Sequence, residues 1–129
     1  MKIKLNKELQ KKLDLFLETK DEKLDEFLKI LGFEKFTFSK EEINNMEAIY
    51  KKDNTLKQYV CIYVGEAVID IFGGFWSIGK FKKDSAYELP IILGKGGKED
   101  SPRICPDIWI KIIDTRGLRL PLGDFIYSL

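Results

Sequence analysis

The sequence predicts an α+β fold in which about four helices come first and a small, mainly antiparallel sheet of three to four strands follows. Apolar residues recur at three- and four-residue steps as far as residue 72, which is the periodicity of amphipathic helices. After Gly73 and Gly74, short runs rich in aromatic and β-branched residues alternate with loops that contain glycine or proline, a pattern typical of strands. Because the chain has 129 residues and no low-complexity linker, we expect a single domain over residues 1–129.

The first two helices are predicted from two separate apolar stripes. The first stripe has a leucine at every fourth position and supports a helix over about residues 6–19. The Thr-Lys-Asp sequence at 19–21 interrupts it. A second stripe begins at Leu24 and ends before Gly32, which is a common type of helix stop.

The third and fourth helices are predicted from their start signals and from the apolar run that follows. Ser39 and Glu42 have the S-x-x-E spacing of a capping box, which predicts a helix that continues to about Lys52. A break follows it. With Asn54 as its expected cap, a fourth helix then covers about residues 55–72, and its nearly continuous apolar character places it at the centre of the fold.

Three segments of the second half are predicted as strands. They are residues 75–78, 89–93 and 107–113, each with aromatic or β-branched content, and we expect Phe75 and Trp76 to be core residues. The tail at 122–129 is apolar and fits either a last strand or a helical turn.

The absence of histidine from the whole chain excludes several kinds of chemistry. It removes Ser-His-Asp and Cys-His catalysis, general acid–base catalysis by histidine and nearly all zinc and non-haem iron sites. The two cysteines, Cys61 and Cys105, are too few for a structural zinc site or a disulfide framework, and Cys61 is expected to be buried. We therefore expect no metal, no cofactor and a reducing, cytoplasmic location.

The charge balance gives no reason to expect nucleic acid or membrane partners. The formal net charge is +1, so the chain as a whole is not basic. The basic N-terminus is not followed by the apolar segment of a signal peptide, and the apolar run at 59–72 is too short to span a bilayer. The Gly-Lys-Gly-Gly-Lys sequence at 94–98 is followed by acids and a proline, so we expect a hairpin loop there and not a phosphate-binding loop.

The most unusual residues are two acids in the fourth helix. Tyr59, Tyr63, Glu66 and Asp70 fall on one face of that helix and form its only polar stripe. Three interpretations remain open. The carboxylates have an internal partner, such as Arg103, Arg116 or a lysine, or form a solvated stripe at the edge of the sheet; they line the mouth of a site for a cationic ligand or a partner's basic side chain; or they act together in acid–base chemistry or in holding a metal.

Gly65 lies within the same helix and opposes it, since glycine costs about 1 kcal/mol relative to alanine in a helix interior. Its presence suggests that another backbone or an aromatic ring approaches closely. The glycine pair Gly73 and Gly74 is expected to end the helix in a left-handed conformation, and Trp76 is expected to pack back on the helix.

This part of the chain resembles a pattern in small uncharacterised bacterial proteins, Y-x-G-E-x-[IV]-x-x-x-[FY]-G-G-x-W. The matching residues here are Tyr63, Gly65, Glu66, Val68, Phe72, Gly73, Gly74 and Trp76. The pattern continues with a proline-led strand, here at 90–92, and a later P-x-x-x-[IV] strand, here at 106–110, so that the resemblance covers about residues 56–113. Some of these proteins are similar to immunity proteins encoded beside polymorphic toxins. The resemblance assigns no catalytic residues.

Together these observations predict a non-enzymatic protein-binding module, in its narrower form an immunity-type protein with a toxin domain as partner. The alternative is a small-ligand-binding protein whose pocket lies against the Tyr59–Asp70 stripe. Loops on a rigid scaffold are where contacts with a partner are expected. The loop residues predicted to make such contacts are Lys80, Lys82, Lys83, Lys95 and Lys98.

Overall fold

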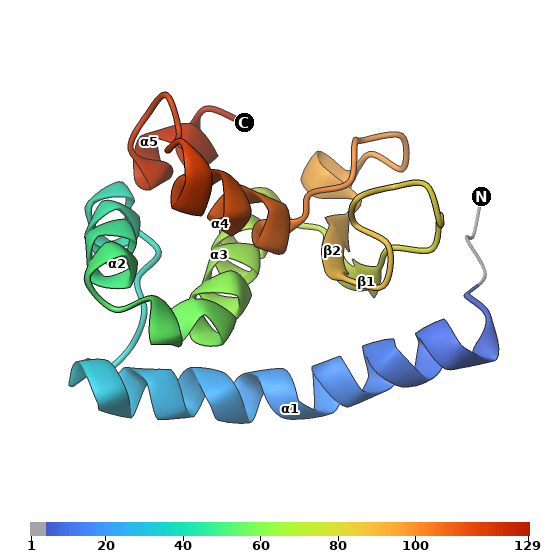
Figure 1. Ribbon diagram of the computed structural model, residues 1–129, viewed down its shortest axis with the longest axis horizontal. Helices are drawn as coiled ribbons and strands as arrows, with labels where there is room; N and C mark the ends of the chain where they lie inside the picture. The colour runs from blue at the N-terminus through green and yellow to red at the C-terminus, as the bar shows by residue number, and fades with distance from the viewer. Residues whose placement is uncertain (1–4) are drawn as a thin grey trace.

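Helix α3 (Lys57–Phe72) lies at the centre of the molecule, with the other elements arranged around it (Figure 1). The computed structural model describes residues 5–129. The remaining elements are α1 (Lys7–Leu31), α2 (Lys40–Lys52), η1 (Asn54–Leu56), β1 (Phe75–Ile78), β2 (Pro90–Leu93), η2 (Lys95–Gly97), α4 (Pro106–Thr115) and α5 (Leu122–Tyr127). Helix α1 runs along one side of the molecule, α2 and α5 pack together at one end, and the two strands lie toward the other end (Figure 1). The α+β class is confirmed.

Helix α1 is one helix of 25 residues, so the prediction of two helices separated at 19–21 was wrong. The Thr19 hydroxyl donates a hydrogen bond to the carbonyl of Leu15, at 2.9 Å, and is therefore satisfied within a continuous helix. The ends are as the sequence suggests. The side chain of Asn6 accepts a hydrogen bond from the Leu9 N–H, and Gly32 closes the helix with a φ of 73°.

Helix α2 begins at the predicted capping residue. The Ser39 hydroxyl accepts a hydrogen bond from the Glu42 N–H at 3.1 Å. The Glu42 carboxylate accepts hydrogen bonds from the N–H groups of Thr37 and Phe38, two residues and one residue before the cap. At the next break, Asp53 and not Asn54 provides the cap, because its carboxylate accepts from the N–H of Thr55.

The two strands form an antiparallel hairpin in which Phe75 pairs with Leu93 and Ile78 pairs with Pro90. The strands predicted at 75–78 and 89–93 are thus found within one residue. Among residues 5–129 the sheet has two strands, fewer than the three to four expected, and one isolated bridge from Ile92 to Ile104 widens it. Gly73 ends α3 as predicted, but the expected left-handed conformation was wrong: its φ is positive, at 81°, whereas its ψ of −172° is extended.

The third predicted strand, residues 107–113, is instead helix α4, and the P-x-x-x-[IV] segment at 106–110 lies inside it. Pro106 occupies the first helical position and Asp107 follows it in the first turn, two placements that favour a helix start. Ile110 and Ile113 are buried three residues apart, as on the inner face of a helix. The tail forms the short helix α5, so of its two alternatives the helical one is confirmed.

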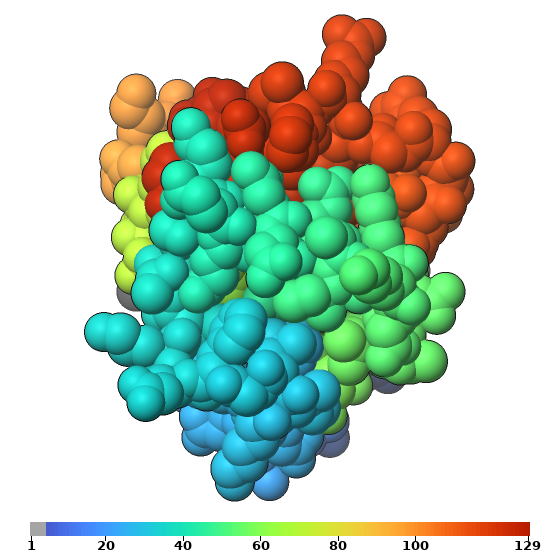
Figure 2. Space-filling view, turned by 90° about the vertical axis from the view of Figure 1, so that its left-hand side faces the viewer, coloured from blue at the N-terminus to red at the C-terminus, as the bar shows by residue number. Residues whose placement is uncertain are grey.

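One continuous core joins α1, α2, α3, both strands, α4 and α5. Its largest side chains without exposed surface include Phe27, Ile43, Tyr63 and Leu122, each from a different helix. Figure 2 shows the face that α2 covers, with α1 below it and the chain between α4 and α5 above. No helix among residues 5–129 combines the length and apolar character that crossing a bilayer requires.

Candidate functional site

The two tyrosines of the predicted polar stripe are held by internal acids. Tyr63 is completely buried and its hydroxyl donates to Glu42 at 2.8 Å. Burial, together with this hydrogen bond, raises the pKa of Tyr63. Tyr59 is half-buried, stacks on Phe27 with ring centroids 5.3 Å apart and donates to Glu26 at 3.0 Å. Both tyrosines thus serve contacts between α3 and the helices that precede it.

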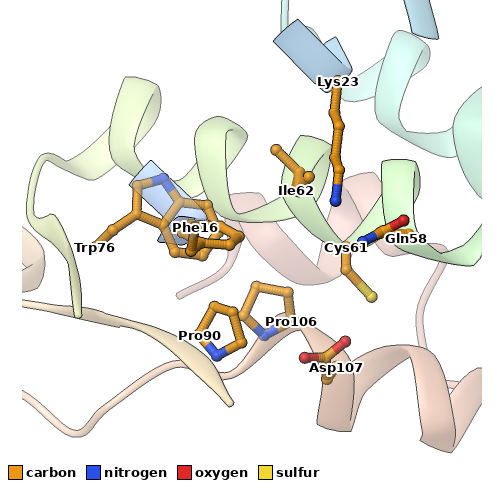
Figure 3. A pocket seen from close by; sticks show the side chains of 9 residues that line it. All are labelled: Phe16, Lys23, Gln58, Cys61, Ile62, Trp76, Pro90, Pro106 and Asp107. Carbon is orange, nitrogen blue, oxygen red and sulfur yellow. The ribbon is translucent and has the colours of Figure 1, made fainter. Parts of the chain in front are cut away.

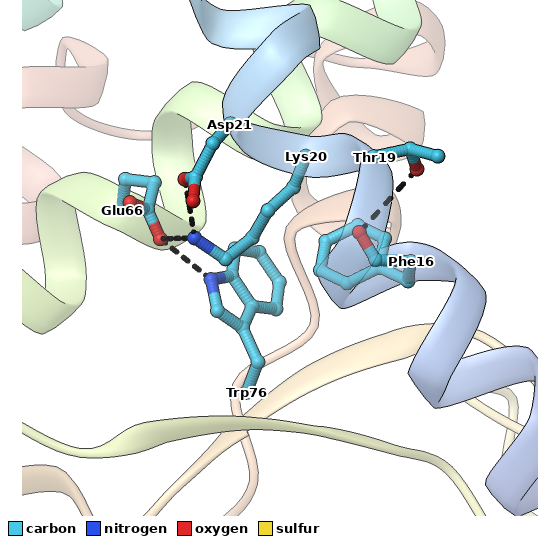
Figure 4. Close-up of polar contacts among 6 residues, drawn as sticks. All are labelled: Phe16, Thr19, Lys20, Asp21, Glu66 and Trp76. Carbon is cyan, nitrogen blue, oxygen red and sulfur yellow. Dashed lines mark hydrogen bonds and ion pairs between the residues drawn. The ribbon is translucent and has the colours of Figure 1, made fainter.

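Glu66 is the acceptor in a small network that joins α1, α3 and β1 (Figure 4). The indole Nε1 of Trp76 donates to its Oε2 at 2.6 Å, and Lys20 Nζ lies 3.5 Å from the same oxygen. Lys20 also bonds Asp21 at 2.8 Å. Burial alone would lower the pKa of Lys20, but the hydrogen bond to Asp21 and the attraction of Glu66 raise it overall. Of the three interpretations of Glu66, the geometry therefore matches the internal partner, a lysine.

Asp70, one turn further along α3, has a different environment. Its side chain is exposed and forms no ion pair with any residue from 5 to 129. The carboxylates at 66 and 70 are thus not assembled as one charged pair around a common partner. Three of the four stripe residues are occupied by internal hydrogen bonds. None of the four lines the cavity beside Trp76 or the two hollows next to Glu41 and Asp114.

The predicted contact loop after β1 is basic because its acids are neutralised from elsewhere. Asp84 binds Arg103, and Glu88 binds Lys12 of α1. The lysines at 80, 82 and 83 form no ion pair within residues 5–129, and both Lys82 and Lys83 are exposed. Phe81 between them is 62% exposed, with Lys80 Nζ 5.1 Å from its ring centroid. We call residues 80–83 the basic loop.

The Asp84–Arg103 pair fixes one end of the basic loop. Arg103 donates two hydrogen bonds, from Nε at 2.9 Å and from a terminal nitrogen at 2.5 Å. With the backbone N–H of Ala86, this fork lowers the pKa of Asp84 to about 2. Because Arg103 follows the loop that begins at Gly94, the pair also joins the two loops that the sequence analysis singled out.

The second loop contributes less exposed positive charge. Lys95 is half-buried, with Nζ 4.9 Å from the ring centroid of Phe72, whereas Lys98 is exposed. Phe75, expected in the core, is 58% exposed and leans against Gly94 at the start of this loop. Its strand position faces away from the core, since only Trp76 and Ile78 of β1 are buried.

A cavity of about 190 Å³ lies on a neighbouring face of α3 (Figure 3). Residues of α1, α3, both strands and α4 line it. Two of them, Cys61 and Trp76, were expected from the sequence to be buried, but neither was predicted to line a cavity. Cys61 points into this cavity, where burial and the adjacent Asp107 raise the pKa of its thiol. No local motif predicts such a cavity, because it forms only where five elements meet.

Comparison of the chain with protein-family models, with curated proteins and with solved structures finds no significant match in any of the three. The resemblance to immunity proteins therefore stays a prediction from the pattern of residues 63–76. Functional proposals for this chain rest on the basic loop, the cavity and the sequence pattern.

Proposed function

We propose that this protein is a non-enzymatic protein-binding module whose contact surface is the basic loop. One observation carries the proposal. The acids at 84 and 88 are each paired with a base from outside residues 80–88, while Lys82 and Lys83 are left exposed beside an exposed phenylalanine. Binding surfaces often combine a buried aromatic anchor with a polar rim. Here Phe81 would be the anchor, and the lysines around it, unpaired within residues 5–129, would form the rim.

The basic loop belongs to the segment of residues 79–89, whose two ends are bonded to each other, which favours binding. Gly79 N–H donates to the carbonyl of Leu89 and Glu88 N–H donates to that of Gly79, each at 2.9 Å. The Asp84–Arg103 fork fixes the end of the basic loop at residue 84, near the middle of this segment. A loop that is ordered before contact loses less conformational entropy on binding, so more of the contact energy appears as affinity.

The chemistry of the loop favours a partner with an acidic protein surface and an apolar depression for Phe81. Complementary charge raises the rate of association and excludes basic partners. The resemblance to immunity proteins supports the narrower form of the proposal, in which this acidic partner is a bacterial toxin domain. The non-enzymatic part is supported by the lack of histidine and by the raised pKa of both thiols, Cys61 and Cys105, which keeps them protonated.

The test is capture of a partner from native host lysate with three tagged proteins. They are the wild type, the double variant Lys82→Glu/Lys83→Glu and the control Lys52→Glu/Lys111→Glu, which reverses two exposed lysines elsewhere. We expect one stoichiometric acidic protein with the wild type and the control, and retention reduced by about tenfold or more with the loop variant. Equal retention by the loop variant would overturn the assigned surface, and no retained protein would overturn the module itself.

A second step tests the immunity-type proposal. The captured protein is expressed alone and together with this chain, and growth of the expressing cells is measured. We expect growth arrest by the partner alone, relief by the wild type and reduced relief by the loop variant. If the partner alone does not arrest growth, the partner is not a toxin. The immunity-type proposal would then be wrong, and the proposal of a protein-binding module would stand.

A further inference from the structure

The cavity beside α3 has one apolar end and one polar end (Figure 3). Its apolar end is formed by Phe16, Ile62, Trp76, Pro90 and Pro106. The rings of Phe16 and Trp76 meet edge to face at 61° with centroids 4.7 Å apart, so the two rings support each other. The bond from Trp76 Nε1 to Glu66 fixes the orientation of the same ring. This end is a preformed wall for an apolar group.

The polar end holds two opposite charges that do not neutralise each other. Lys23 enters from α1 and Asp107 from the first turn of α4, and both line the same cavity. Neither forms an ion pair within 4.0 Å with the other, or with any residue from 5 to 129. Gln58 lies beside Cys61 at the same end, and its amide makes no hydrogen bond within that part of the chain. These three groups converge on one space from different helices.

We propose that this cavity binds a small zwitterion with an apolar side chain, of the class of the apolar α-amino acids. Its carboxylate would accept from Lys23 and Gln58, its ammonium group would donate to Asp107, and its side chain would lie against Trp76 and Pro90. A ligand of this kind bridges two facing charges that are too far apart to pair directly. Charge-assisted hydrogen bonds of this type are stronger than hydrogen bonds between neutral groups, so they can fix the orientation of the ligand.

The size of the cavity agrees with this class. A dry cavity of about 150 Å³ accommodates benzene. The present cavity of about 190 Å³ has room for a group of that size and a few further atoms. Larger molecules, such as nucleotides, exceed it. Ligand pockets for drug-sized molecules begin at about 300 Å³.

Cys61 faces the polar end of the cavity. The state of its thiol fits a site that binds a ligand non-covalently and does not fit covalent catalysis. Its thiol is kept protonated by burial and by the negative charge of Asp107, and a protonated thiol is a poor nucleophile. The site is also independent of the proposed protein partner, since no residue of the basic loop lines the cavity. Either proposal can therefore fail without the other.

The test uses nuclear magnetic resonance of the full chain, because the two indole N–H signals report different places. Trp76 lines the cavity, whereas Trp109 packs against Phe125 at 5.0 Å and serves as a control in the same spectrum. L-leucine, L-methionine and L-phenylalanine are titrated to about 10 mM, a range that detects millimolar dissociation constants. Glycine, which has no side chain, and isovalerate and isopentylamine, which each have one charge, are the matched probes.

We expect saturable shifts of the Trp76 signal with at least one apolar amino acid and weaker binding, by about tenfold or more, of all three matched probes. Lys23→Gln and Asp107→Asn should each weaken binding by about tenfold, whereas Lys29→Gln, an exposed lysine of the same helix, should leave it unchanged. Lys23 has no internal ion pair to lose, so its variant should fold normally even if the Asp107 variant does not. The proposal is overturned if no amino acid shifts the Trp76 signal, if glycine binds equally well, or if Lys23→Gln binds like the wild type.

Discussion

The indole ring of Trp76 lies directly over Gly65 of α3. A Cβ atom built on Gly65 would be 2.0 Å from Cη2 of that ring and 2.3 Å from Cζ2. This contact confirms the expectation that an aromatic ring approaches the glycine, and it explains a glycine in the middle of a buried helix. The ring is itself held by Phe16 and Glu66, so it cannot move aside easily.

Gly65→Ala should therefore destabilise the protein although alanine is the better helix former. Helix propensity alone would stabilise the variant by about 1 kcal/mol. Displacing a buried ring costs about 1–3 kcal/mol, and the 2.0 Å approach places this site at the upper end of that range. After subtraction of the gain in propensity, we expect a net loss of about 2 kcal/mol in the free energy of unfolding by urea titration. Ala48→Gly, at an exposed position of α2, measures propensity without a steric contact. A Gly65→Ala variant as stable as the wild type would contradict the contact.

The two carboxylates of the stripe should differ in their effect on stability. Glu66→Met leaves the Trp76 N–H without its acceptor and Lys20 with one partner fewer, which should cost about 2 kcal/mol. Glu66→Gln keeps an oxygen acceptor and should cost less than half of that. Asp70→Asn, exposed and unpaired among residues 5–129, should stay within about 0.5 kcal/mol of the wild type. If Glu66→Met costs no more than Asp70→Asn, the Glu66 network does not stabilise the fold.

The Asp84–Arg103 pair predicts an acid-sensitive contribution to stability. The pKa of Asp84 is about 2 in the folded protein, against an ordinary value of 3.8, so the folded state favours the ionised form. The stabilisation is therefore fully present above pH 3.8 and is lost as the pH falls toward 2. We expect the difference in free energy of unfolding between the wild type and Asp84→Asn to shrink over that interval.

Arg103→Gln is the matched variant for this experiment, because it removes the same pair from the other side. Its difference from the wild type should shrink over the same pH interval, in parallel with that of Asp84→Asn. A difference for either variant that is independent of pH below 3.8 would show that the fork does not bias ionisation of Asp84.

The sequence predicts the elements whose signals are local and misses those decided by tertiary packing. The cap at Ser39, the stop at Gly32 and the hairpin strands at 75–78 and 90–93 are each encoded within a few residues. Residues 107–113 are rich in isoleucine, which suits a strand or a buried helix equally well. Pro106 and Asp107 are the residues that indicate a helix start. The prediction gave more weight to the β-branched residues that follow them, and therefore assigned a strand.

The candidate site residues also divide into those with a local sequence signal and those brought together only by tertiary packing. The exposed lysines of the basic loop were identified because loop residues can be found from sequence alone. The internal partners of Glu66 come from residues 20 and 76, and no spacing rule connects these with a helix that begins at 57. The cavity needs Lys23, Gln58 and Asp107 to meet from three helices, which only the packed chain specifies.

Helix α5 should detach as a unit when its connections to α2 are removed. Glu47 is buried, and its Oε1 accepts from the N–H of Leu122 at 2.8 Å. Asn44 accepts from the N–H of Gly123 at 2.6 Å and donates to Asp124 at 2.9 Å. These bonds satisfy the first N–H groups of a helix with only six residues, which is too short to be stable by itself.

Because Asn44 and Glu47 hold the same helix end, their substitutions should not be additive. Asn44→Ala and Glu47→Met should each cost about 1–3 kcal/mol, and the double variant should cost clearly less than their sum, since the second substitution acts on a helix already released. Trp109 emission provides the structural readout, because its ring contacts Phe125 of α5 at 5.0 Å. Release of α5 should expose that ring and shift its emission to longer wavelength. Additive losses with unchanged emission would mean that α5 stays docked through its apolar face, held by Leu122 and Ile126 without the help of these polar bonds.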